Sequence, residues 1–519
     1  MNEFQQTLEQ VNNMQYTENG ATGYSKSGKN LVDLNFTVPS NHNNVSLENI
    51  QKFIQSLNED LVHTVKWMFY LRDVREGLGE RDSFVNLYMT LYSNNQEAAL
   101  KVLPLIPVYG RWKDVIDILD RAADDGNLSG TIYALLEAQL MEDCQNMADG
   151  KSISLLSKWM PSINSTKKAR KLAMRICRNL NLLFVDYRKM LAALRRYIDV
   201  TEVKTCGGNW KEIDYNKVSS NANARYLKAF MKHDEVRRRK YLEDLTKPVT
   251  GAVMHASNLY PHEVYAKYHE HGGYRSKVTP DAGIEALWAN LKDIPTTGNT
   301  MCVCDGSGSM ECYIKGSKVM AIDVSRALSI FFAEKCQGEF KDKVIEFSAY
   351  PRYIDLTGCK TLADKYNVMN QYDDCSNTNL EKVFNLLLKT AVDHNLPQEE
   401  LPTRLLIVSD MEFDKAGEYR TNYSCTNYDV VMEQYKTLFQ HIKESWDAAG
   451  YTMPDIVFWN VNSRTNTIPV TANEVGVNLV AGFSANNVKM ILSGELDPWT
   501  ALQSVLDSER YDAIEEVLA

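Results

Sequence analysis

The residues with the clearest chemistry in this 519-residue sequence lie in the stretch MCVCDGSGSM, residues 301–310. Asp305, Ser307 and Ser309 place one carboxylate and two hydroxyls at alternate positions of a glycine-rich loop. Oxygen ligands of this kind suit a hard divalent cation. The intervening glycines allow the loop to turn tightly enough to aim the oxygens at one point. The stretch therefore predicts a site that holds Mg²⁺ or another divalent cation such as Mn²⁺.

The elements that position these oxygens follow from the pattern of the C-terminal half. Short apolar runs alternate with helical stretches there, and the runs are TMCVC, KVIEFS, RLLIVS, DIVFWNV and VNLVAGF. This alternation predicts a doubly wound, Rossmann-like α/β domain with a parallel sheet covered on both faces. Ligands of such sheets bind beyond the carboxyl ends of the strands. DGSGS directly follows its strand and is expected at that edge.

Two more oxygen-bearing side chains are expected at the same edge. Thr378, in SNTNLEKVF, lies in a polar loop just before a helix, and Asp410, in RLLIVSDMEFD, ends an apolar strand. The predicted metal-binding set is Asp305, Ser307, Ser309, Thr378 and Asp410. A simpler interpretation is that Asp305 and the serines only cap the following helix, but capping explains neither Thr378 nor Asp410.

This combination of DxSxS, a distant Thr and a distant Asp resembles the metal-ion-dependent adhesion site of von Willebrand factor A domains. The resemblance implies that the hydroxyls of Ser307, Ser309 and Thr378 coordinate the metal. Asp305 and Asp410 would act directly or through water. One coordination position would be left for a water or for a carboxylate from a protein partner.

The sequence departs from many A domains after the second aspartate. Met411 stands where a glycine is common, and Glu412 and Asp414 add two acids that either raise the cation affinity or are solvated. Hydrolysis is a further alternative, because Asp305 and Asp410 could hold Mg²⁺ for phosphoryl transfer. The chain has no GxxxxGK[ST] loop and no second carboxylate beside Asp305. We therefore predict a binding protein and not an enzyme.

The middle of the chain has a helical pattern. Apolar residues recur at spacings of three and four, as in Leu61, Val65 and Met68, and short stretches with glycine or proline separate the helices. Successive antiparallel helix pairs, as in a HEAT-like array that can close into a ring, fit this pattern best. The predicted segments are a polar N-terminal segment at 1–45, extended or partly disordered at its start, a HEAT-like helical domain at 46–290, and the α/β domain at 291–519.

The charge of the chain is uneven. The net charge is −10 overall, yet residues 158–240 carry +14, against −9 for 1–157 and −15 for 241–519. A basic block of this kind predicts a surface that neutralises phosphates and binds a polyanion with strong salt dependence. The residues predicted to contact RNA are Lys167, Lys168, Arg170, Lys171, Arg175, Arg178, Arg188, Lys189, Arg195 and Arg196. The alternatives are a solvated helix face and an intramolecular contact with the acidic C-terminal domain.

Aromatic residues are interleaved with these cations. Tyr187 and Tyr197 flank the second half of the basic run. Exposed aromatic rings of this kind can stack on unpaired bases. The alternative is that they belong to the core, because aromatics at helical spacing usually do.

The N-terminal half resembles a second family. Five segments carry the resemblance, and they are TENGATGYSKSGKNLVDL, FYLRDVREGLGERDSF, IPVYGRWKDVIDIL, LLSKWMPS and YRKMLAALRRYIDVTE. In this order they are similar to the uncharacterised domain-of-unknown-function 2828 family, which itself resembles the TROVE module of the Ro ribonucleoproteins. In Ro-like proteins a ring of HEAT-like helices is closed by an A domain. The resemblance implies a non-enzymatic, ribonucleoprotein-like protein that binds small structured or misfolded RNA without specificity for DNA. The alternative is a metal-dependent protein-interaction adaptor without a nucleic-acid partner.

The overall composition excludes several other classes. No apolar run reaches 18 residues, and the N-terminus is polar, so neither a membrane span nor a secretory signal is expected. The ten cysteines include no CxxC pair and no Cys/His cluster at zinc spacing. This pattern indicates reduced thiols and a cytoplasmic location.

Overall fold

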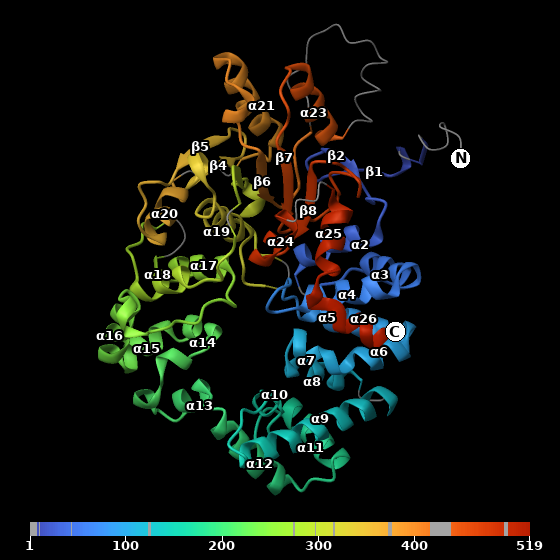
Figure 1. Ribbon diagram of the computed structural model, residues 1–519, viewed down its shortest axis with the longest axis vertical. Coiled ribbons are helices and arrows are strands. Elements are labelled where there is room, and N and C mark those ends of the chain that lie inside the picture. Colours follow the sequence, from blue (N-terminus) through green and yellow to red (C-terminus); the bar gives the residue numbers. More distant parts are fainter. Residues whose placement is uncertain are drawn as a thin grey trace. The chain divides into compact units, whose positions relative to one another are not determined.

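A computed structural model of the chain describes residues 8–9, 11–42, 44–122, 126–272, 276–295, 297–314, 317–371, 376–415, 437–492 and 497–519 (Figure 1). These residues form two compact units. The first unit consists of Met1–Trp67 and Ser257–Glu509, and the second of Met68–Ala256 and Arg510–Ala519.

The first unit is built on a six-stranded sheet with the order β5-β4-β3-β6-β7-β8. All neighbouring strands are parallel except β4 and β5, which are antiparallel. The chain enters at the centre with β3, moves outward to β5, and then returns to β6 on the other side of β3. The order of the strands therefore reverses between β3 and β6, which is the position where doubly wound sheets bind ligands. The strands are β3 (Thr300–Asp305), β4 (Lys343–Phe347), β5 (Arg352–Asp355), β6 (Arg404–Ser409), β7 (Asp455–Asn460) and β8 (Val477–Ala481).

Helices bury this sheet, which is why its central strands are continuously apolar. α19 (Ala321–Ala333) is buried along its whole length and packs on β3, β4 and β6, and α17 (Pro261–Gly272) packs on α19. α21 (Leu380–His394) packs on β4 and on α23 (Leu438–Ala448). The further helices of this part are α18 (Ala282–Ala289), α20 (Leu362–Met369), α24 (Val488–Ile491) and α25 (Pro498–Leu506). The predicted doubly wound α/β fold is confirmed.

The N-terminal segment belongs to the same unit. β1 (Met14–Tyr16) and β2 (Thr22–Tyr24) form an antiparallel hairpin, and α2 (Asn30–Thr37) packs on β8. α3 (Leu47–Glu59) follows, and the hydroxyl of Ser46 caps its first turn. The expectation of an extended segment is therefore wrong for α2, while residues 1–7, at the start of the predicted segment, lie outside the described residues. The polar composition hid seven consecutive buried residues in α2, among them asparagine, aspartate and threonine.

The second unit is helical. Neighbouring helices pack in pairs, such as α5 with α6, α7 with α8, α11 with α12 and α15 with α16. Within its described residues the unit has no strand, so the predicted helical character is confirmed. Its helices are α5 (Asp82–Asn94), α6 (Gln96–Val102), α7 (Ile106–Tyr109), α8 (Trp112–Arg121), α9 (Gly126–Ala148), α10 (Leu156–Trp159), α11 (Lys167–Asn179), α12 (Phe184–Tyr197), α13 (Thr201–Cys206), α14 (Ser220–Arg225), α15 (Leu227–His233), α16 (Glu235–Leu245) and α26 (Asp512–Leu518), while α4 (Leu61–Arg72) runs from the first unit into the second.

The two units do not follow the predicted segments 1–45, 46–290 and 291–519. The first unit takes the hairpin, α2 and α3 from the start of the chain and α17 and α18 from the helical region. Of these helices, α2 packs on the sheet, α3 packs on α2, and α17 and α18 pack on the helices that cover the sheet. No helix in the described ranges is long and apolar enough to cross a membrane.

Candidate metal centre and basic surface

The two predicted metal-binding aspartates lie on adjacent strands at the switch point of the sheet. β3 and β6 pair in parallel, with Cys304 opposite Val408. Asp305 ends β3, and Asp410 comes directly after the last residue of β6. Both side chains are fully buried. The sequence therefore places the two carboxylates correctly at the carboxyl edge, on the strands between which the order reverses.

The DGSGS loop turns immediately after Asp305. Gly306 donates its backbone N–H to the carbonyl of Phe347, at 2.9 Å. A Cβ atom on Gly306 would lie 2.9 Å from the side chain of Glu346, so only glycine fits here without displacing that buried residue. The Ser307 N–H donates to Asp305 Oδ1, at 2.9 Å, which fixes the orientation of the carboxylate.

Helix capping does not account for these residues. The loop continues into a single 3₁₀ turn, Gly308–Met310, which receives no capping hydrogen bond from the side chain of Ser307. The next α-helix, α19, begins only at Ala321, after Met320. The alternative interpretation of Asp305 and the serines as N-caps is therefore wrong.

The hydroxyls link the two aspartates. The Ser307 and Ser309 Oγ atoms lie 3.0 Å apart. The side chain of Ser307 lowers the pKa of Asp305, and the side chain of Ser309 lowers the pKa of Asp410, so each hydroxyl interacts with one of the two carboxyl groups. Four of the five predicted ligands thus form one continuous cluster of oxygen atoms.

Thr378 is held in the neighbouring loop, just before α21. Its side chain is buried, and its carbonyl accepts a hydrogen bond from the N–H of Asp414, at 2.9 Å. Two residues earlier, the carbonyl of Ser376 accepts from the N–H of Gly308, at 3.1 Å. Backbone hydrogen bonds therefore tie the Thr378 loop to both aspartate loops, and the structure brings the loops of all five predicted residues together.

The electrostatics of the cluster favour a cation. Burial and the nearby charge of Asp410 raise the pKa of Asp305 to about 7. Burial also raises the pKa of Asp410, although the guanidinium of Arg464, whose Nη2 lies 3.3 Å from Asp410 Oδ2, opposes this shift. Two buried carboxylates that repel each other are stabilised by a divalent cation between them. The donor set of two carboxylates and three hydroxyls fits Mg²⁺ or Mn²⁺.

Two residues of the site were not predicted. The Ser409 hydroxyl donates to Asp305 Oδ2, and its Oγ accepts the N–H of Met411 at 3.0 Å. Arg464 reaches Asp410 from the segment after β7. The only signal for Ser409 is a hydroxyl at the end of an apolar strand, while no local pattern marks Arg464.

Glu412 corrects another expectation. It is neither solvated nor directed at the cation cluster, because its carboxylate is completely buried and accepts hydrogen bonds from two segments, the tip of the β1–β2 hairpin and residues 463–465. The donors are the N–H groups of Glu18 (2.8 Å), Arg464 (2.7 Å) and Thr465 (2.8 Å) and the hydroxyls of Ser463 (3.3 Å) and Thr465 (3.0 Å). Glu412 therefore holds the loop after β6 against its neighbours.

Replacing Glu412 with alanine is expected to destabilise the protein by about 3–5 kcal/mol, because five donors lose their acceptor in a buried site. Denaturant unfolding measures this change as a lower midpoint. The matched control is Glu399→Ala, at an exposed acid in the same unit, for which a change within about 0.5 kcal/mol is expected. Equal midpoints for the two variants would contradict the structural role of Glu412.

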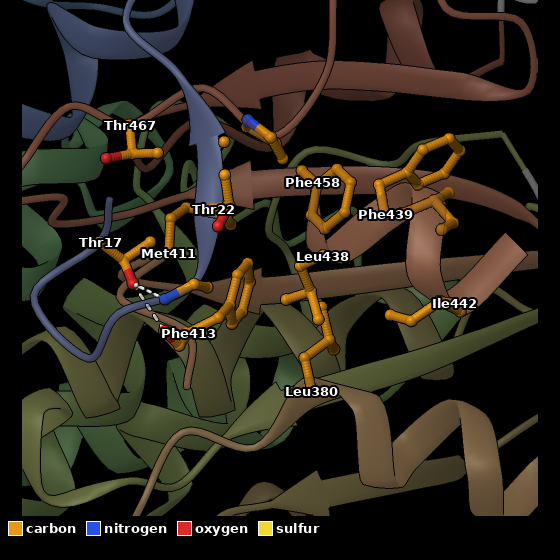
Figure 2. Close-up of a pocket in the computed structure, with 14 residues that line it drawn as sticks. Thr17, Thr22, Leu380, Met411, Phe413, Leu438, Phe439, Ile442, Phe458 and Thr467 are labelled. Carbon is orange, nitrogen blue, oxygen red and sulfur yellow. Dashed lines mark hydrogen bonds between the residues drawn. The ribbon is translucent and has the colours of Figure 1, made fainter. Parts of the chain in front are cut away.

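The structure also explains how the chain differs from A domains at Met411. Its backbone adopts φ +64°, in the left-handed region that favours glycine. The side chain is 2% exposed and lines an apolar pocket with Phe413 and Phe458 (Figure 2). Burial of the thioether chain offsets the backbone strain, since removing a buried Met costs about 2–5 kcal/mol.

The ten basic residues predicted to bind RNA lie on α11 and α12. Three of them have partners within the protein, and of these three only Lys168 is exposed. Arg195 donates three hydrogen bonds to residues 157–162, Arg175 donates to a backbone carbonyl of α8, and Lys168 pairs with an aspartate of α8 at 2.8 Å. The other seven are exposed and form no ion pair within the described part of the chain. They are Lys167, Arg170, Lys171, Arg178, Arg188, Lys189 and Arg196.

The aromatic residues divide between core and surface. Tyr187 is buried and donates its hydroxyl to the carbonyl of Pro161, at 2.7 Å, so it belongs to the core. Tyr197 is 40% exposed, and Phe184, at the start of α12, is 45% exposed. A hollow lined by Arg188 and Lys189 lies beside α12.

Comparisons with known proteins match most of the chain to two families of unknown function. Residues 17–143 and 167–294 match the family "Domain of unknown function (DUF2828)", which confirms the predicted resemblance, and residues 299–514 match "Domain of unknown function (DUF7788)". "Uncharacterized protein L728" of Acanthamoeba polyphaga mimivirus is 29% identical, over 95% of this chain and 87% of that protein. The crystal structure of the Deinococcus radiodurans RO (RSR) protein matches with a TM-score of 0.36 and 12% identity, over 85% of this chain and 92% of that chain.

The described residues contain no group of three or more His, Cys, Asp or Glu side chains that could hold a metal. The cluster around Asp305 combines only two such acids with hydroxyl groups. It lies within the residues matched by the DUF7788 family, and α11 and α12 lie within those matched by the DUF2828 family. The chain thus carries a DUF2828 domain followed by a DUF7788 domain.

Proposed function

We propose that this protein is a non-enzymatic, RNA-binding protein that holds Mg²⁺, or Mn²⁺ in its place, at the cluster of Asp305, Ser307, Ser309, Thr378 and Asp410. One observation carries the metal assignment. Two buried aspartates, each interacting with a serine of the DGSGS loop, lie on adjacent strands at the switch point of the sheet. Carboxylate and hydroxyl oxygens are what such cations bind.

The pH dependence of stability tests the metal site. Without a cation, the raised pKa of Asp305 means that the folded protein binds a proton more tightly than the unfolded chain. The stabilising effect of this proton is complete below about pH 4 and is lost as the pH rises through 7. We therefore expect Mg²⁺ to raise the thermal unfolding midpoint by several degrees at pH 8 and by much less at pH 5.5, where protons compete with the metal.

Asp305→Asn is the control for this experiment, because it removes the titrating group and keeps a side chain of the same shape. Its midpoint is expected to respond to Mg²⁺ at neither pH. A wild-type midpoint that is the same with EDTA and with Mg²⁺ at pH 8 would contradict the metal assignment.

The basic surface of α11 and α12 supports the RNA part of the proposal. Seven exposed cations lie within about 30 residues of sequence, and none of the seven forms an ion pair within the described part of the chain. Phe184 and Tyr197 expose aromatic rings on the same helix as Arg188 and Lys189. Cations with neighbouring aromatic rings suit phosphates and unpaired bases.

The second candidate function is a metal-dependent adaptor, in which the site captures a carboxylate from a protein partner and no RNA is bound. Tyr313 and Tyr350, 67% and 65% exposed, follow DGSGS and β4 at the same edge of the sheet, and exposed tyrosines are common in protein interfaces. Co-purified RNA distinguishes the candidates, because it raises the ratio of absorbance at 260 nm to that at 280 nm and is removed by ribonuclease.

A further inference from the structure

The β1–β2 hairpin is fastened to the loop that carries Asp410. At its tip, the Thr17 hydroxyl donates to the carbonyl of Phe413, at 2.6 Å, and the Asn19 side chain donates to the carbonyl of Glu412, at 2.6 Å. The Glu18 N–H donates to the Glu412 carboxylate, at 2.8 Å. The tip is therefore held by side-chain and backbone contacts beside the candidate metal centre.

Apolar packing supports these contacts. Thr17 and Thr22 of the hairpin line the pocket that also contains Met411, Phe413 and Phe458 (Figure 2). Gly23 lies so close to the segment after β7 that a Cβ atom there would be 2.7 Å from a carbonyl oxygen. The hairpin is thus a packed part of the first unit, and its tip has a defined position.

A carboxylate at this tip points toward the metal centre. Glu18 Oε2 lies 2.8 Å from Nη2 of Arg464, and the same Nη2 lies 3.3 Å from Asp410 Oδ2. Because both contacts end on one nitrogen, the two carboxylate oxygens are at most about 6 Å apart. The Glu18 side chain is 55% exposed, so it can change rotamer without displacing closely packed neighbours.

We propose that Glu18 is a carboxylate ligand of the metal centre supplied by the chain itself, and that Arg464 is the positioning residue that keeps Glu18 beside Asp410. This inference rests on the proposed metal site. Glu18 takes the coordination position that a partner's carboxylate or a water would otherwise take. The hairpin therefore competes with any acidic partner for the metal.

The distances allow this change without moving the hairpin. Two oxygens on one octahedral Mg²⁺ are about 3 to 4 Å apart, because each metal–oxygen bond is about 2.1 Å. Glu18 Oε2 then has to approach Asp410 by about 2 to 3 Å, which rotation about its side-chain bonds provides while its N–H stays on Glu412. The doubly charged cation replaces the singly charged guanidinium between the carboxylates.

Calorimetric titration of the full-length protein with MgCl₂ tests this inference. Glu18→Gln removes the charge and keeps the shape, and we expect it to weaken Mg²⁺ binding about tenfold. Glu399→Gln, which makes the same change of charge at an exposed site, is expected to leave the affinity within about twofold. An unchanged affinity in Glu18→Gln overturns the inference.

A second pair of variants tests whether Glu18 binds the metal or only forms an ion pair with Arg464. In the background of Arg464→Gln, Glu18→Gln is again expected to weaken binding at least fivefold, because the ligand is still lost. An effect of Glu18→Gln only when Arg464 is present overturns the ligand role. If the wild-type protein binds no Mg²⁺, the proposed metal site itself is wrong, whereas normal wild-type binding with an unaffected Glu18→Gln refutes only the inference.

Discussion

Replacing Asp305 with alanine is expected to abolish Mg²⁺ binding to the full-length protein in calorimetric titrations. Asp305 supplies one of the two carboxylates of the cluster and accepts hydrogen bonds from the Ser307 N–H and the Ser409 hydroxyl. Its removal therefore takes away a ligand and leaves these two donors without their acceptor. Cation affinity follows the number of charged ligands, and losing one of two carboxylates lowers it at least about 100-fold.

Two further variants make this result specific. Asp305→Asn keeps the shape and most hydrogen-bond partners, and the same loss of affinity is expected for it, which separates charge from folding. Asp393→Ala, at an exposed acid in α21, is expected to bind Mg²⁺ like the wild type. Retained Mg²⁺ affinity in Asp305→Ala, with circular dichroism showing an intact fold, would refute the assignment.

Reversing four charges on α11 is expected to weaken RNA binding at least about 100-fold at moderate salt. The variant combines Lys167→Glu, Arg170→Glu, Lys171→Glu and Arg178→Glu. All four residues are exposed, so the fold is expected to tolerate the changes. Each lost phosphate contact also lowers the slope of log affinity against log salt by about 0.7 to 0.9.

The measurement is fluorescence anisotropy with a labelled RNA hairpin that has single-stranded tails. The matched control changes four exposed cations of the first unit, Lys341, Arg352, Lys360 and Lys389, to glutamate, so that the net charge is the same in both variants. The control is expected to lose less than tenfold. Equal losses in the two variants would show that only overall charge matters, and no loss in either would remove RNA as a partner of this surface.

The sequence contains most of the candidate metal centre. Asp305 and Asp410 follow continuous apolar strands, and parallel strands bring their carboxyl ends to one edge, so the meeting of these side chains can be predicted from pattern alone. Thr378 follows the same logic, because a polar loop before a helix that returns to the sheet also lies at that edge. Local rules suffice wherever a residue directly follows a strand.

Other parts of the site depend on contacts between distant segments. Glu18 and Arg464 lie more than 440 residues apart in sequence, and only the packing of the hairpin brings them together. Glu412 appeared to be a solvated acid because its five donors come from other segments. Composition also misrepresented α2, whose polar side chains are buried.

The basic block shows a similar limit. Charge counting identified ten cations on α11 and α12, but it could not show that Arg175 and Arg195 donate to backbone carbonyls of neighbouring segments. Those bonds satisfy buried acceptors and belong to the fold. The seven exposed cations that form no ion pair within the described part of the chain are the ones that can still bind a polyanion.

The most direct test of the central claim is the anomalous scattering of Mn²⁺ in crystals of the full-length protein grown or soaked with MnCl₂. The proposal predicts one strong anomalous peak among the oxygens of Asp305, Ser307, Ser309, Thr378 and Asp410, with Glu18 turned toward it. A peak at this position without Glu18 would keep the metal site and refute the inference about the hairpin. Crystals saturated with Mn²⁺ that show no peak at the cluster, with Arg464 still paired to Asp410, would contradict the account.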